Sequence, residues 1–139
     1  MKKLNNPILL EYYIKKHTLN NFLNNNLLNY IEIHTFNKNE FLCTLNEKLL
    51  YMYFLVDGKY KVTTLLSSGK SLLLCFNTPL SIMGDIEFIE NPYADCNVQA
   101  LENCICLALP ISKIKDYGYD DPVFLRFIIY SLQKKLRRN

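Results

Sequence analysis

The most constraining feature of the sequence is a series of short runs of β-branched, aromatic and aliphatic residues between residues 30 and 110. Turn residues separate these runs at intervals of about 8–12 residues, which is typical of β-sandwiches and barrels. Strands are therefore expected at 31–36, 40–44, 50–56, 59–66, 71–76, 96–101 and 104–109. A chain of 139 residues, half of them hydrophobic, has the size of one domain and can bury a core without disulfides or metals.

Two turn signals punctuate the strand region. Asp57-Gly58 is the dipeptide preferred in a two-residue type I′ turn, so it predicts a hairpin over residues 50–66. The next turn is expected at residues 67–70, where Gly69 can adopt a positive φ without strain.

Helices are expected on both sides of the strand region. Apolar residues recur at helical spacing over residues 7–28, and Pro7 suits a first turn. Asp121 and Pro122 suit the N-cap and first helical position, and the segment from there to Asn139 contains no helix breaker. The sequence predicts one or two short amino-terminal helices and a final helix of about four or five turns.

The final predicted helix is apolar on more than one side. One face carries Phe124, Phe127 and Ser131. A second face, with the spacings of three and four residues found in coiled coils, consists of Leu125, Ile128, Ile129, Leu132 and Leu136. We expect this second face to pack on the same helix of a second copy. The alternative is that these residues complete the core of a single chain.

Charge and hydropathy exclude several classes of protein. The net charge is +3, and the excess basic residues lie at the two ends, so no strong nucleic-acid-binding face is indicated. The longest purely apolar run, 49–56, has eight residues, which is too short for a membrane span, and no apolar signal segment is present. The five cysteines are an odd number, and we expect a soluble, cytoplasmic protein with reduced thiols and no membrane partner.

The order of these elements resembles the cyclic nucleotide-binding domain of the Crp/Fnr family of bacterial transcriptional regulators. The matching segments are 53–62, similar to the family's strand-turn-strand opening; Gly69; 83–88, similar to the Gly-Glu core of its phosphate-binding cassette; 98–100; and Cys104, Cys106 and Leu107. The resemblance implies a mainly β fold with flanking helices, a double-stranded β-helix (jelly-roll) barrel that senses an effector. It also implies a homodimer formed through the long helix and a DNA-binding helix-turn-helix domain beyond it.

This resemblance gives a domain organisation. Residues 1–29 are expected to form an amino-terminal helical segment and residues 30–117 the cyclic nucleotide-binding-like jelly roll. Residues 118–139 are expected to begin the dimerisation helix. The DNA-binding domain is then expected outside this chain.

The predicted ligand cassette departs from the family pattern. In relatives that bind cyclic AMP, a glutamate accepts a hydrogen bond from the ribose and an arginine neutralises the phosphate. Here the glutamate position is Asp85, and the arginine position falls at Ala94 or Tyr93. No Lys or Arg occurs between Ser71 and Ser112, so an anionic ligand would meet uncompensated negative charge. The candidate pocket residues are Met83, Gly84, Asp85, Ile86, Tyr93, Ala94, Asp95 and Cys96.

Two interpretations of this pocket remain open. A neutral or cationic small molecule would suit a pocket that contains Asp85 and Asp95, whereas cyclic AMP and cyclic GMP are not expected to bind. Alternatively, Tyr93, Phe88 and Met83 fill the pocket and nothing is sensed. No cofactor or metal is expected in either case.

Other chemistry finds little support in the sequence. The cysteines are not grouped as an iron–sulfur cluster requires, so buried thiols in the barrel wall are expected, with a redox role for Cys96 as the alternative. His17 and His34 do not form a cupin-like pair, and His34 is expected on the exposed side of a strand. No nucleophile elbow, phosphate-binding loop or zinc spacing is present, and an enzyme is not expected.

These observations predict the effector-sensing and dimerisation domain of a cytoplasmic Crp/Fnr-type transcriptional regulator. The domain is expected to form a homodimer, not to respond to cyclic AMP, and to reach DNA only through a helix-turn-helix outside this chain. The alternative is a stand-alone protein-interaction module with a vestigial pocket.

Overall fold

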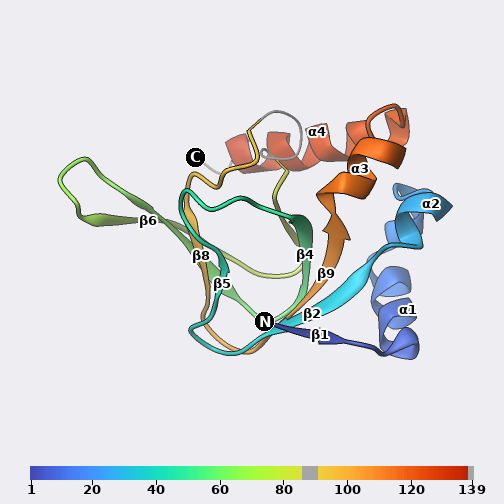
Figure 1. Cartoon of the computed structure of the whole chain (residues 1–139), viewed down its shortest axis with the longest axis horizontal. Coiled ribbons are helices and arrows are strands. Elements are labelled where there is room, and N and C mark those ends of the chain that lie inside the picture. The colour runs from blue at the N-terminus through green and yellow to red at the C-terminus, as the bar shows by residue number, and fades with distance from the viewer. Residues whose placement is uncertain (86–90, 138–139) are drawn as a thin grey trace.

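The computed structural model describes residues 1–85 and 91–137, and two antiparallel sheets form the centre of this part of the chain (Figure 1). The five-stranded sheet has the order β1-β2-β9-β4-β7, and the four-stranded sheet has the order β3-β8-β5-β6. The strands are β1 (Lys2–Leu4), β2 (Glu32–Phe36), β3 (Phe41–Cys43), β4 (Tyr51–Asp57), β5 (Tyr60–Leu65), β6 (Ser71–Asn77), β7 (Ser81–Met83), β8 (Asn97–Ala100) and β9 (Cys104–Pro110). The mainly β jelly-roll fold with flanking helices is confirmed.

Helices flank the sheets at both ends of the chain. They are α1 (Pro7–Lys16), a 3₁₀ turn η1 (Leu19–Asn21), α2 (Asn25–Leu28), α3 (Ile111–Tyr117) and α4 (Pro122–Arg137). In Figure 1 these helices gather along one side of the sheets, while the β5–β6 hairpin projects away from them. The amino-terminal helices and the long final helix agree with the sequence, whereas α3 was not predicted.

The hairpin expected over residues 50–66 is wrong. β4 pairs with β7 and β9, whereas β5 pairs with β6 and β8, so the chain crosses from one sheet to the other at Asp57-Gly58. Gly58 has the positive φ (+104°) that the dipeptide indicates, but the backbone there passes close to Asn103 and Cys104 instead of closing a two-stranded turn. A positive φ therefore marks a reversal without specifying which strands pair.

The next turn agrees with the sequence. Gly69 has φ +84°, its N–H donates to the Leu66 carbonyl at 2.9 Å, and the Leu66 N–H donates to the Lys70 carbonyl at 2.8 Å. These bonds close the β5–β6 hairpin.

Strand β4 is buried on both faces, which explains why its sequence shows no polar alternation. On one face, Tyr53 contacts His34 and Phe36, with ring centroids 5.5 and 5.6 Å apart respectively. On the other face, Phe54 lies 6.4 Å from Phe127 of α4. This strand therefore joins the interior of the jelly roll to the helical layer.

The expectation that His34 is exposed is wrong, because its side chain is only 1% exposed. Its strand pairs with β9 on one side and with the unpredicted β1 on the other. Glu32 Oε1 lies 2.9 Å from His34 Nε2, and the Tyr53 hydroxyl lies 3.0 Å from Nδ1. An ionised Glu32 can only accept, so Nε2 carries the proton and Nδ1 accepts from Tyr53. The buried imidazole is thus fully hydrogen-bonded.

The start of α4 agrees with the predicted cap. Asp121 Oδ1 accepts hydrogen bonds from the backbone N–H groups of Val123 at 3.0 Å and Phe124 at 3.3 Å. Asn24 Nδ2 donates to the other carboxylate oxygen at 2.7 Å, and this bond, followed by the backbone bonds, holds the pKa of Asp121 below its usual value. The cap therefore also ties α4 to the amino-terminal helices.

The two faces of α4 differ from the expected ones at Ile128. Phe124 and Ile128 are buried in the core of the same chain, and Phe127 stacks on Phe22 with ring centroids 3.6 Å apart. Ile128 therefore belongs to the inner face, four residues after Phe124. We call the remaining residues of the proposed second face, Leu125, Ile129, Leu132 and Leu136, the outer stripe. Leu125 and Leu132 are half-buried against the core of the same chain, whereas Ile129 and Leu136 are exposed.

Candidate functional site

A cavity of about 440 Å³ lies between the four-stranded sheet, the segment after β7 and the carboxyl-terminal half of α4. Its lining residues are Tyr60, Val62, Thr64, Leu74, Cys75, Asn77, Ile82, Met83, Gly84, Asp85, Asp95, Cys96, Val98 and Lys135. The lining therefore combines an apolar wall with hydroxyl, amide and thiol groups, two carboxylates and one ammonium group.

The structure brings together five of the eight candidate pocket residues. Met83, Gly84, Asp85, Asp95 and Cys96 all line the cavity. The segment that resembles the phosphate-binding cassette therefore lies at the border of this cavity.

Of the other three candidates, Tyr93 and Ala94 are not part of this lining. Ile86 lies outside the described residues. The Tyr93 side chain is exposed. Ala94 is buried against the loop between β3 and β4. Its N–H donates to the Glu47 carbonyl at 3.0 Å, and its carbonyl accepts from the Asn46 N–H at 2.8 Å. Tyr93 therefore does not fill the cavity.

Asp85 is positioned by a close backbone approach at Gly84. Gly84 has φ +98°, and a Cβ atom there would lie 3.0 Å from Leu49 Cδ2 and 3.2 Å from both Met52 Cα and the Tyr51 carbonyl oxygen. Only glycine fits this turn without displacing β4. The turn directs the Asp85 carboxylate inward, where its side chain is 1% exposed.

Both oxygens of the Asp85 carboxylate are bound by α4. Lys135 Nζ donates to Oδ1 at 2.8 Å, and Ser131 Oγ donates to Oδ2 at 3.1 Å. Lys135 Nζ also donates to the Ile82 carbonyl at 2.8 Å. We call Asp85, Ser131 and Lys135 the latch, because they join the cassette segment to the final helix.

Lys135 is the functional residue that the sequence reasoning missed. The absence of Lys and Arg between Ser71 and Ser112 correctly describes the cassette segment, but the cation comes from a helix fifty residues further along the chain. A signal was present in the helical spacing. Ser131 and Lys135 continue the inner face of Phe124 and Ile128 at intervals of three and four residues.

Besides Asp95, the remaining polar side chains of the lining are hydroxyl, amide and thiol groups. Burial raises the pKa of Tyr60 above its usual range, so its phenol stays protonated at neutral pH. Cys75 Sγ accepts a hydrogen bond from Asn77 Nδ2 at 3.3 Å. Outside the cavity, burial likewise raises the pKa values of Cys104 and Cys106, which keeps these two thiols in their unreactive form.

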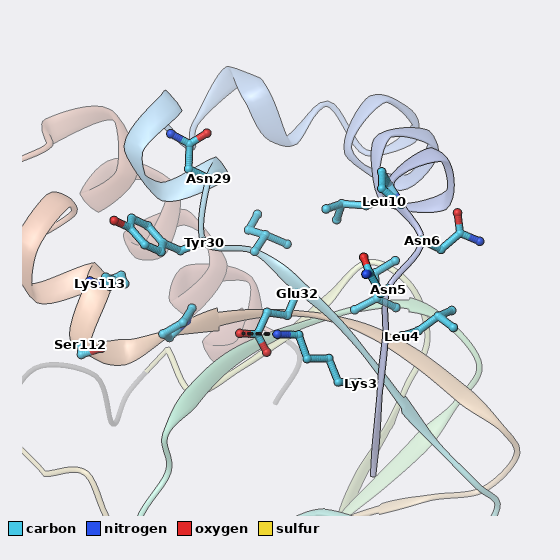
Figure 2. A pocket seen from close by; sticks show the side chains of 14 residues that line it. Lys3, Leu4, Asn5, Asn6, Leu10, Asn29, Tyr30, Glu32, Ser112 and Lys113 are labelled. Atoms are coloured by element: carbon cyan, nitrogen blue, oxygen red, sulfur yellow. Dashed lines mark ion pairs between the residues drawn. The ribbon is translucent and has the colours of Figure 1, made fainter.

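A second hollow, of about 530 Å³, borders β1, the start of α1, β2 and the start of α3 (Figure 2). Its charged groups are engaged with neighbouring side chains: Lys3 Nζ lies 3.5 Å from Glu32 Oε2, and Lys113 Nζ lies 4.4 Å from the centre of the Tyr30 ring. It contains none of the cassette residues. The cavity at Asp85 is therefore the better candidate site.

Residues 1–85 and 91–137 lack three features that would indicate other functions. No group of three or more histidine, cysteine or acidic side chains there is arranged to hold a metal ion. None of the five cysteines, all of which lie in these ranges, forms a disulfide. No helix in these ranges is long and apolar enough to cross a membrane.

A two-sheet jelly roll with a glycine–acid turn at a ligand-sized cavity and a long helix across it defines a class of regulatory ligand-binding domains. The cyclic nucleotide-binding domain family matches residues 33–117, which is more than half of the chain. The chain belongs to the cyclic nucleotide-binding domain family.

The chain is also similar to an individual protein that is named as a regulator. The chain is 32% identical over 89 residues to the regulatory protein YeiL of Escherichia coli O157:H7, a match that covers 64% of this chain and 41% of that protein. The chain thus matches about two fifths of the length of this relative.

Solved structures confirm the resemblance to Crp/Fnr-type regulators at the level of the fold. A transcriptional regulator from Thermotoga maritima is 24% identical with a TM-score of 0.67, over 80% of this chain and 87% of that one. The sensor domain of the transcriptional regulator DNR from Pseudomonas aeruginosa is 15% identical with a TM-score of 0.73, over 94% and 91% of the two chains. These relatives are named as regulators and not as enzymes.

Proposed function

We propose that this chain is the effector-sensing and dimerisation domain of a Crp/Fnr-type transcriptional regulator. The observation that supports this most directly is the latch, because the same cavity is lined by the cassette segment and by Lys135 of α4. A ligand that enters the cavity would act on α4 through direct contact. Residues 1–29, 30–117 and 118–139 would serve as helical segment, jelly roll and dimerisation helix, and DNA would be bound by a domain outside this chain.

The proposal predicts that the latch restrains the second half of α4. Lys135→Gln removes a charge-assisted hydrogen bond, and such bonds contribute about 1.5–3 kcal/mol. Amide hydrogen exchange in the carboxyl-terminal half of α4 is therefore expected to accelerate about tenfold or more. Lys134→Gln removes the neighbouring positive charge without touching Asp85 and should leave these rates unchanged. Equal exchange rates in both variants and the original chain would show that α4 does not respond to the cavity.

The proposed homodimer forms through the outer stripe of α4. The stripe repeats at intervals of four, three and four residues, and Ile129 and Leu136 are 63% and 76% exposed. Because an isolated helix face of this kind fits the same face of a second helix, the partner we propose is a second copy of the chain. Ile128 takes no part in this interface, since it lies in the core.

Ile129→Glu is expected to convert a dimer into a monomer in sedimentation velocity, because it places two like charges at the helix contact. Tyr130→Glu provides a control, since Tyr130 is similarly exposed but lies off the stripe. The original chain sedimenting as a monomer, or both variants dissociating equally, would contradict the outer stripe as the interface.

Cyclic AMP is not proposed as the effector. A phosphate that took the Lys135 ammonium would remove it from Asp85, and Asp85 would remain a buried carboxylate held by Ser131. Breaking a buried ion pair by removing one partner is costly. Lys135 therefore does not take over the role of the arginine that neutralises the phosphate in relatives that bind cyclic AMP.

The second candidate function is a protein-interaction module with a vestigial pocket. The observation that favours it is the β5–β6 hairpin, which projects from the sheets (Figure 1). Large apolar side chains of this hairpin are exposed. These side chains are Leu65, Leu66, Leu72, Leu73, Leu74 and Phe76. Contiguous exposed apolar surface commonly marks a binding surface. In a module of this kind no small molecule would bind the cavity and change amide exchange in α4, so exchange measured with and without a bound ligand separates the two functions.

A further inference from the structure

The two members of the latch ion pair differ in burial, and this difference bears on what the cavity accepts. The Asp85 side chain is 1% exposed, whereas the Lys135 side chain is 39% exposed. An anionic ligand that bound the Lys135 ammonium would leave the buried Asp85 carboxylate without its cation. A cationic ligand that captured Asp85 would release Lys135 from a position that already reaches solvent, which costs much less.

A neighbouring hollow can accept the Lys135 ammonium after it is displaced from Asp85. Lys135 also borders a smaller hollow of about 290 Å³ between β7 and α4. This hollow is lined in addition by Lys134, Ser131 and Tyr130, so the ammonium can turn toward water without unwinding the helix. The exchange of one cation for another therefore leaves no charge buried and unpaired.

The charge of the cavity favours a cation as well. Asp85 and Asp95 both line it, and Lys135 is the one Lys or Arg among the described residues of its lining. Once Lys135 turns outward, the buried Asp85 carboxylate is left at the cavity, and the exposed Asp95 lies at its border. The apolar part of the lining includes Val62, Leu74 and Val98, which suits an aliphatic body.

We propose that the effector is a small organic cation with one or two ammonium groups on an apolar body, and that its ammonium replaces that of Lys135 on Asp85. This inference rests on the proposed sensor function and names its ligand class. The Lys135 ammonium, which is bound to the Asp85 carboxylate, occupies the position proposed for the cationic group of the ligand. Binding opens the latch, and α4 is released from the cassette segment.

The test is isothermal titration of the whole 139-residue chain with hexamethylenediamine at low salt. Hexanediol, adipate and cyclic AMP serve as neutral and anionic comparisons. The diamine is expected to bind and the other three compounds not to bind. Lys135→Gln should bind the diamine about tenfold more tightly or better, because the ligand no longer competes with the latch. Asp85→Asn should abolish binding, while Lys134→Gln should bind as the original chain does.

Each outcome separates the ligand class from the sensor function. Failure of the diamine to bind even Lys135→Gln, or equal binding of hexanediol, overturns the cationic class. Binding of cyclic AMP with accelerated exchange in α4 overturns the cationic class and leaves the sensor function standing. Binding of the diamine without any change in α4 exchange supports the class and overturns the sensor function.

Discussion

Phe124→Ala is expected to lower the free energy of unfolding by about 3–5 kcal/mol, because a fully buried phenylalanine is replaced by a cavity. Phe124 is 0% exposed and lies in the first turn of α4, directly after the Asp121 cap. Its ring also fills the space beside Gly118, where a Cβ atom would lie 3.2 Å from Phe124 Cδ2. For a domain of this size the loss corresponds to a decrease of about 10–20 °C in Tm.

The control for this variant is Val123→Ala in the same helical turn. Val123 is 47% exposed, and surface substitutions of this kind change stability by about 0.5 kcal/mol or less. Chemical denaturation of the two variants measures the difference directly. A loss below about 1 kcal/mol for Phe124→Ala would show that α4 is not anchored through its inner face, and the latch would then lose its support as well.

The sequence predicted the long elements of the fold because their signals are local. The apolar run of β4, the turn at Gly69 and the Asp121 cap each depend on residues close together in the chain. The three-residue strands β1 and β7 were not predicted, because such short strands are specified by the neighbours they pair with. The error at His34 has another cause, because Tyr51 and Tyr53 of β4 lie against its ring, with ring centroids 4.7 and 5.5 Å away.

The sequence could predict the part of the candidate site that a single segment of the chain forms. Gly84 and Asp85 follow from a local turn, and they line the cavity as expected. Lys135 comes from another element, and its role depends on how α4 crosses the cassette segment. A count of charges within the cassette therefore gave the correct local charge and missed the cation that neutralises Asp85.

The error at Asp57-Gly58 leads to the second large effect, which is expected for Gly58→Ala. Gly58 has φ +104°, and a Cβ atom there would lie 2.7 Å from the Asn103 carbonyl oxygen and 2.9 Å from Cys104 Cα. Both atoms belong to the backbone and cannot rotate away, so the crossover between the sheets must shift. Strain and overpacking together should reduce the free energy of unfolding by about 2–5 kcal/mol.

Gly69→Ala separates these two causes. Gly69 has φ +84°, but no atom lies within 4 Å of a Cβ placed there, so only the backbone strain of about 1–2 kcal/mol applies. Urea denaturation of both variants should show the larger loss at Gly58. Equal losses would mean that the two sheets separate locally at little cost, and that Asp57-Gly58 requires glycine for its φ alone. A larger loss at Gly58 would show that the close approach to β9 fixes how the two sheets meet.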